Sequence, residues 1–86
     1  MKTVKIEFIT DSGCERCEEA KRRVSALLAE NAIIANIVFH KADSARAGEL
    51  SVDYGLDDIP SFLVNGRVFE GEKFSSDEFL VAARRK

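Results

Sequence analysis

The sequence predicts an α/β domain in which a mixed four-stranded sheet is flanked by helices. Apolar runs with strand periodicity alternate along the chain with amphipathic segments of helical periodicity. An Asn-Gly pair then joins the last two apolar runs, as in a tight hairpin. The predicted order is β-α-β-α-β-β-α, with parallel strands in the opening unit and antiparallel strands in the hairpin. The 86 residues leave no room for a second domain, so we expect a single domain over residues 1–86.

The first strand and the first helix meet at a short polar turn. Residues 4–8 alternate apolar and charged side chains, which predicts a strand. Ser12 and Glu15 have the spacing of a capping box, so we expect them to begin a helix. Apolar side chains recur on one helical face from Cys17 to Leu28, and Asn31 is expected to end the helix.

The second strand and the second helix follow directly. Residues 33–39 form a nearly unbroken apolar run, which predicts a strand buried on both faces. Asp43 or Ser44 is expected to cap a short helix that ends near Gly55.

A hairpin and a closing helix complete the predicted fold. Residues 61–69 contain Asn-Gly between two apolar runs, the preferred pair for a type I′ turn. Ser75 and Glu78 form a capping box, and Phe74 and Phe79 have the spacing of a hydrophobic staple.

Charge and composition argue against several kinds of partner. The net charge is −2, and no basic face interleaved with aromatic residues is visible, so we expect no nucleic-acid partner. The basic residues 84–86 are interpreted as a solvated helix end. No long apolar run is present and residues 1–10 do not resemble a signal peptide, so we expect no membrane association and a cytoplasmic location.

Cys14 and Cys17 form a C-x-x-C pair at the junction of the first strand and helix. Because structural disulfides are rare in the cytosol, this pair indicates catalysis or metal binding. A helix N-terminus lowers the pKa of a thiol, which predicts Cys14 as the attacking thiolate. Cys17 lies one turn further in and is expected to resolve the mixed disulfide. Between them, Arg16 favours the thiolate and Glu15 disfavours it.

Metal binding is the alternative interpretation of the same pair. Zinc sites use four ligands, and the chain offers two thiolates and the distant His40. A zinc or copper carrier would therefore need a dimer that pools two pairs. We expect a monomer without a cofactor instead, and a solvated His40 with no catalytic role.

The dipeptide Ile59-Pro60 stands just before the third predicted strand and is a candidate for a cis bond. Together with the C-x-x-C after the first strand, it makes the chain resemble the thioredoxin superfamily over almost its whole length. The segment KIEFITDSGCERCEEAKR is most similar to glutaredoxins and to short glutaredoxin-like thioredoxins. The resemblance implies a thioredoxin-like fold, thiol-disulfide oxidoreductase activity and a cis-proline packed beside the dithiol. The Ile59 backbone and Arg16 are expected to bind substrate beside Pro60.

Several positions depart from the patterns of that superfamily. Phe8 stands where many thioredoxins have a buried aspartate, no tryptophan precedes Cys14, and Glu-Arg replaces the Pro-Tyr of glutaredoxins. The glutaredoxin glutathione motif is only faintly echoed by Gly71 and Asp77. Asp57 and Asp58 would in addition repel an anionic tripeptide. We therefore expect a reductant of protein disulfides, with either a reductase or glutathione as its electron donor.

Overall fold

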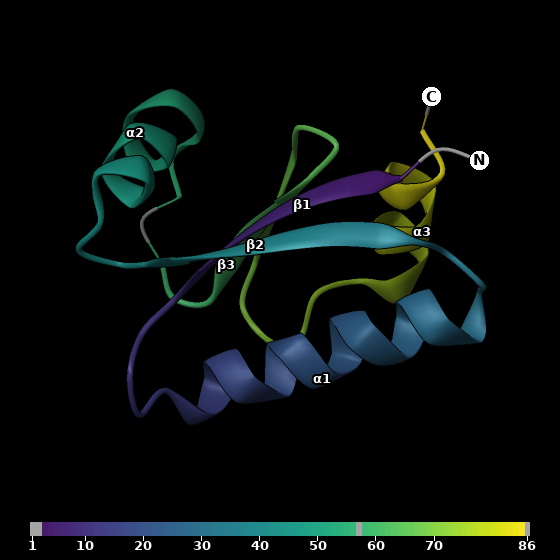
Figure 1. Cartoon of the computed structure of the whole chain (residues 1–86). Coiled ribbons are helices and arrows are strands. Elements are labelled where there is room, and N and C mark those ends of the chain that lie inside the picture. Colours follow the sequence, from purple (N-terminus) through teal and green to yellow (C-terminus); the bar gives the residue numbers. More distant parts are fainter. Residues whose placement is uncertain (1–2, 57, 86) are drawn as a thin grey trace.

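The computed structural model describes residues 3–56 and 58–85 and shows four strands and three helices in the predicted order (Figure 1). The elements are β1 (Val4–Thr10), α1 (Glu15–Glu30), β2 (Ala35–Lys41), α2 (Ala45–Tyr54), β3 (Ser61–Val64), β4 (Arg67–Glu70) and α3 (Ser76–Ala83). Asp57 and Lys86, which the sequence predictions also mention, lie outside the described residues. None of the helices in these two ranges has the length and apolar character that a membrane crossing requires.

The strands form one mixed sheet in the order β2-β1-β3-β4. β1 pairs in parallel with β2, with Phe8 opposite Phe39, and antiparallel with β3, with Phe8 opposite Phe62. β3 and β4 are antiparallel neighbours in the hairpin. The predicted mixed four-stranded α/β architecture is therefore confirmed.

The expectation that the second strand is buried on both faces is wrong. β2 lies at an edge of the sheet, and Val38 and Phe39 are 39% and 51% exposed. An edge strand has a neighbour on one side only, so its apolar residues are covered less completely than those of β1. The apolar run indicated a strand correctly, but it did not indicate the position of that strand in the sheet.

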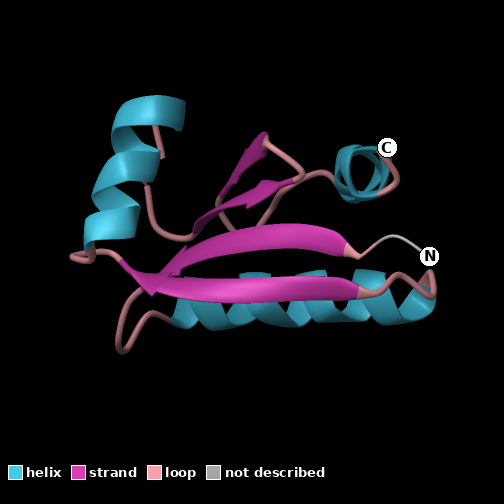
Figure 2. Cartoon of the chain, turned by 45° about the horizontal axis from the view of Figure 1, so that its top comes forward, coloured by secondary structure: helices cyan, strands magenta, loops and turns pink. Residues whose placement is uncertain are grey.

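The two faces of the sheet are covered by different helices. Figure 2 shows α1 running beneath β1 and β2, with α2 on the opposite side of the sheet. Side chains of α1 and α3 share the larger buried cluster with the phenylalanines Phe8, Phe62, Phe69, Phe74 and Phe79. The smaller cluster joins α2 to the other face through Ile9, Ala47, Leu50, Leu56 and Leu63. The sheet is thus the middle layer of three.

The predicted helix ends are mostly confirmed, with one correction. The Ser44 and Ser75 side chains accept hydrogen bonds from the Ala47 and Glu78 backbone N–H groups and cap α2 and α3. The ring centroids of Phe74 and Phe79 lie 5.6 Å apart, as the predicted hydrophobic staple requires.

Ser12 does not cap α1, so the predicted Ser12–Glu15 capping box is wrong. Ser12 lies in the preceding turn, where its backbone N–H donates to the Asp11 side chain. Gly13 has a φ of +69°, and Cys14 is the residue that caps α1.

The hairpin has the conformation that its Asn-Gly pair predicts. Asn65 and Gly66 have φ values of +50° and +86°, the positive values that a type I′ turn requires at both central positions. The Asn65 side-chain amide also donates to the Ala82 carbonyl at 3.0 Å, which ties the turn to the end of α3.

Candidate active site

The two cysteines lie at the start of α1, where the chain leaves β1 (Figure 1). Cys14 and Cys17 form a disulfide with a Cα–Cα distance of 5.2 Å. Cys14 is half-buried, whereas Cys17 is 0% exposed. An approaching reactant can therefore reach the sulfur of Cys14 more easily than that of Cys17.

The sulfur of Cys14 occupies the capping position of the helix. Its Sγ accepts the backbone N–H of Cys17 at 3.1 Å, and its backbone is extended (φ −90°, ψ 103°). The unpaired N–H groups of the first helical turn carry the positive end of the helix dipole. A thiolate at Cys14 would therefore be stabilised by a hydrogen bond already formed in the disulfide state.

Arg16, between the two cysteines, forms an ion pair with a residue that the sequence did not indicate. Its Nε donates to Glu72 Oε2 at 2.8 Å. The Arg16 side chain is 59% exposed, while that of Glu72 is only 16% exposed. The hydrogen bond from Arg16 lowers the pKa of Glu72 below its usual value, and the same bond raises the pKa of Arg16. Asp58 raises the pKa of Arg16 further through its charge.

The loop that carries Glu72 connects β4 to α3 and is held from two sides. Gly71 donates its backbone N–H to the Pro60 carbonyl at 2.7 Å. Arg23 of α1 donates to the carbonyls of Glu72 and Phe74, the latter at 2.8 Å. The Arg23 guanidinium also lies 4.1 Å from the centre of the Phe74 ring, in cation–π geometry. Two arginines of α1 therefore fix this loop against that helix.

The other predicted binding residues are connected to the same loop by the Gly71–Pro60 hydrogen bond. The Ile59–Pro60 peptide bond is cis, Pro60 is buried and Ile59 is partly exposed. Pro60 is connected to Arg16 indirectly, because its carbonyl bonds Gly71 and Gly71 directly precedes Glu72. Arg16 and the Ile59–Pro60 turn thus border one region of the molecule.

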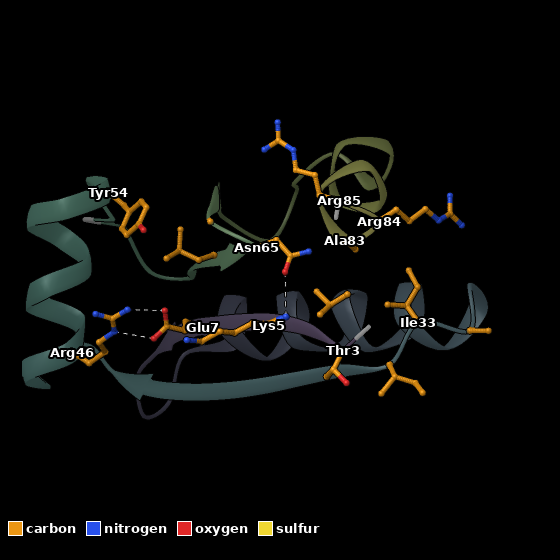
Figure 3. Close-up of a pocket in the computed structure, with 15 residues that line it drawn as sticks. Thr3, Lys5, Glu7, Ile33, Arg46, Tyr54, Asn65, Ala83, Arg84 and Arg85 are labelled. Atoms are coloured by element: carbon orange, nitrogen blue, oxygen red, sulfur yellow. Dashed lines mark hydrogen bonds and ion pairs between the residues drawn. The ribbon is translucent and has the colours of Figure 1, made fainter. Parts of the chain in front are cut away.

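A cavity bordered by α2 lies in another part of the molecule. It lies between α2, the hairpin turn and the end of α3 (Figure 3), and its volume is about 820 Å³. Among the described residues, those of α1 and the dithiol do not line it. It is therefore not the place where a disulfide would meet Cys14.

A charged network borders this cavity. Both carboxylate oxygens of Glu7 accept hydrogen bonds from Arg46 at 2.9 Å, and His40 Nε2 lies 3.3 Å from Glu7 Oε1. The hydrogen bonds from Arg46 lower the pKa of Glu7 to about 2. The His40 side chain is only 17% exposed, so the expectation that it is solvated is wrong. Its neighbour Glu7 lies on the adjacent strand, 33 positions away in the sequence.

Metal-binding side chains do not gather in the described part of the chain. Within residues 3–56 and 58–85, no group of three or more histidine, cysteine, aspartate or glutamate residues is placed to hold a metal ion. A metal held by Cys14 and Cys17 would need further ligands from a second copy of the chain.

No protein-family model and no curated protein sequence matches the chain. Solved structures do match it. The germline-specific thioredoxin Deadhead of Drosophila melanogaster has 17% identity and a TM-score of 0.62, over 92% of this chain and 76% of its own. A malarial protein has 15% identity and a TM-score of 0.57, over 95% and 93%. Thioredoxin NaTrxh of Nicotiana alata has 15% identity and a TM-score of 0.55, over 94% and 70%.

At this level of identity the comparisons bear on the fold. The chain has a thioredoxin-like fold, as its sequence predicted, and carries a C-x-x-C disulfide at the start of its first helix. Such a combination suggests a redox function.

Proposed function

We propose that this protein is a thiol-disulfide oxidoreductase that reduces protein disulfides through Cys14 and Cys17. The observation that carries the proposal is the asymmetry of the pair at the start of α1. Cys14 is half-buried and its sulfur accepts a backbone N–H, whereas Cys17 is fully buried one turn further in. This asymmetry suits an attacking and a resolving thiol, respectively.

The reaction begins with both cysteines reduced. The Cys14 thiolate attacks one sulfur of the substrate disulfide, forms a mixed disulfide and releases the first substrate thiolate. Cys17 then loses its proton and attacks Cys14 Sγ, which forms the Cys14–Cys17 disulfide and releases the second substrate thiolate. Two electrons pass to the substrate, and the two thiol protons of the protein balance the two thiols formed. A thiol such as glutathione, or a reductase, returns the protein to its dithiol state.

Substrate would be held beside the dithiol by the predicted binding residues. The Ile59 backbone can pair with an extended peptide segment, and Pro60 positions that backbone next to the Gly71 loop. Arg16 is 59% exposed and borders the same region. In this proposal the protein acts as a monomer in the cytoplasm, without a resident cofactor.

The proposal is tested by reduction of a protein disulfide such as that of insulin. The wild-type protein should catalyse it with a thiol donor, and Cys14→Ser should abolish turnover. Cys17→Ser should accumulate a mixed disulfide with the substrate, visible by intact-mass spectrometry. Retained turnover in Cys14→Ser would refute the proposal. Stoichiometric zinc or copper in dimers purified under reducing conditions would favour the metal-carrier interpretation instead.

A further inference from the structure

We infer that Glu72 sets the charge preference of the dithiol site, so that the protein disfavours disulfides that carry carboxylates and favours neutral or cationic ones. This inference rests on the proposed oxidoreductase function and names the substrate class of the same site. It starts from the Arg16–Glu72 ion pair, which joins one of the two residues between the cysteines to the loop after β4.

The guanidinium of Arg16, between the two cysteines, already has a partner within the protein. A carboxylate near the substrate disulfide could otherwise pair with Arg16, the one positive charge between the two cysteines. Glu72 accepts the Arg16 Nε–H at 2.8 Å and is itself only 16% exposed. A carboxylate of the substrate could pair with Arg16 only by displacing the carboxylate of Glu72.

Glu72 is held in place by hydrogen bonds of its own loop. Its carbonyl accepts a hydrogen bond from Arg23, and the preceding residue, Gly71, donates to the Pro60 carbonyl at 2.7 Å. The Phe74 carbonyl, two residues further on, accepts another bond from Arg23 at 2.8 Å. These hydrogen bonds on both sides of Glu72 keep its carboxylate paired with Arg16.

Three carboxylates neighbour Arg16 in the structure or in the chain. Glu72 pairs with it, Asp58 lies close enough to act on its titration, and Glu15 is its neighbour in the chain. Lys73, the residue after Glu72, also acts on the Glu72 carboxylate, so at this rim of the site the three carboxylates face two cations, Arg16 and Lys73.

Two of the other cations of α1 have partners within the protein. Lys21 is paired with Glu18 at 3.1 Å, and Arg23 is directed at loop carbonyls. An ammonium or guanidinium group on the substrate therefore meets attraction at this rim, and a carboxylate meets repulsion.

The test uses Glu72→Gln and three small disulfides of similar size: cystamine, which is cationic, bis(2-hydroxyethyl) disulfide, which is neutral, and 3,3′-dithiodipropionate, which is anionic. Removal of the charge that pairs with Arg16 should raise the anionic-to-cationic ratio of kcat/KM by about five- to tenfold at low salt. Using this ratio cancels any change in the reactivity of Cys14 itself. Arg16→Gln should move the ratio in the opposite direction.

Glu78→Gln is the matched control, because Glu78 forms a comparable ion pair with Arg67 at 3.2 Å in another part of the molecule. Its ratio should equal that of the wild-type protein. A ratio unchanged in Glu72→Gln, or equal losses with all three disulfides, would overturn the inference while leaving the oxidoreductase function intact. Absence of turnover of any disulfide by the wild-type protein would refute the proposed function, and the inference with it.

Ionic strength provides a second test on the wild-type protein, which needs no variant. Added salt should slow the reaction with cystamine, speed that with 3,3′-dithiodipropionate and leave the neutral disulfide nearly unaffected. Identical salt responses of the three disulfides would contradict a charge preference.

Discussion

The two faces of the sheet are stabilised by different kinds of interaction. The face covered by α1 and α3 buries a cluster of phenylalanine rings. The centroid of the Phe62 ring lies 5.1 to 5.3 Å from those of Phe8, Phe69 and Phe74. The face covered by α2 buries a smaller aliphatic cluster around Leu50 and adds the charged network of Glu7. It also leaves the cavity of about 820 Å³ open beside α2.

The dithiol belongs to the part of the fold that is stabilised by the aromatic cluster. The helix that carries Cys14 and Cys17 packs on the aromatic face, and the loop of Glu72 is anchored to the same helix through Arg16 and Arg23. The face covered by α2 depends more on ion pairing, through Glu7 and Arg46. The aromatic face should therefore lose less stability in acid than the α2 face.

The largest expected effect is on stability, from truncation in the aromatic cluster. Phe62→Ala should lower the free energy of unfolding by about 3–5 kcal/mol, because a fully buried ring with four aromatic neighbours leaves a cavity. Leu50→Ala, equally buried on the other face, should cost about 2–3 kcal/mol. Urea unfolding of the disulfide form measures both. A larger loss for Leu50→Ala would reverse the proposed difference between the faces.

A smaller effect is expected from Glu7 in acid. Its pKa is lowered to about 2 in the folded chain, chiefly by the hydrogen bonds from Arg46, against 4.5 for an ordinary glutamate. The unfolded chain therefore takes up this proton first, so the stabilisation is fully present above about pH 4.5 and is lost as the pH falls to about 2. Allowing for solvent screening of Arg46, this loss should amount to about 1–3 kcal/mol.

The measurement compares urea unfolding at about pH 6 and pH 3 for the wild-type protein and Glu7→Gln. The wild-type protein should lose more stability between these values than the variant does. Glu49→Gln is the control, because Glu49 also bonds Arg46 at 2.9 Å but is 60% exposed. Equal acid sensitivity of Glu7→Gln and the wild-type protein would show that the network does not stabilise this face.

Local patterns in the sequence were sufficient to predict the order of elements and the place of the dithiol. Alternation, helical periodicity, the serine caps and the Asn-Gly turn depend on residues close together in the chain, so they are visible without a structure. The one wrong cap, Ser12, arose because Gly13 inserts a turn and the following cysteine takes the capping position.

The parts that could not be predicted depend on contacts between distant segments. Arg16 and Glu72 are 56 positions apart, and neither shows a local signal that would pair it with the other. His40 meets Glu7 only because β2 pairs with β1 in a particular register. The exposure of Phe39 likewise depends on the position of β2 at the edge of the sheet. Chain topology, rather than composition, decides these features.

The central claim is that Cys14 is the attacking thiol, and the rates at which the two cysteines are alkylated test it most directly. The fully reduced protein is pulsed with iodoacetamide at about pH 6, where only a thiol with a lowered pKa reacts quickly, and the modified residues are identified by peptide mass spectrometry. Cys14 should be alkylated first, and Cys14→Ser should remain nearly unreactive under the same conditions. Faster alkylation of Cys17 than of Cys14 would contradict the account.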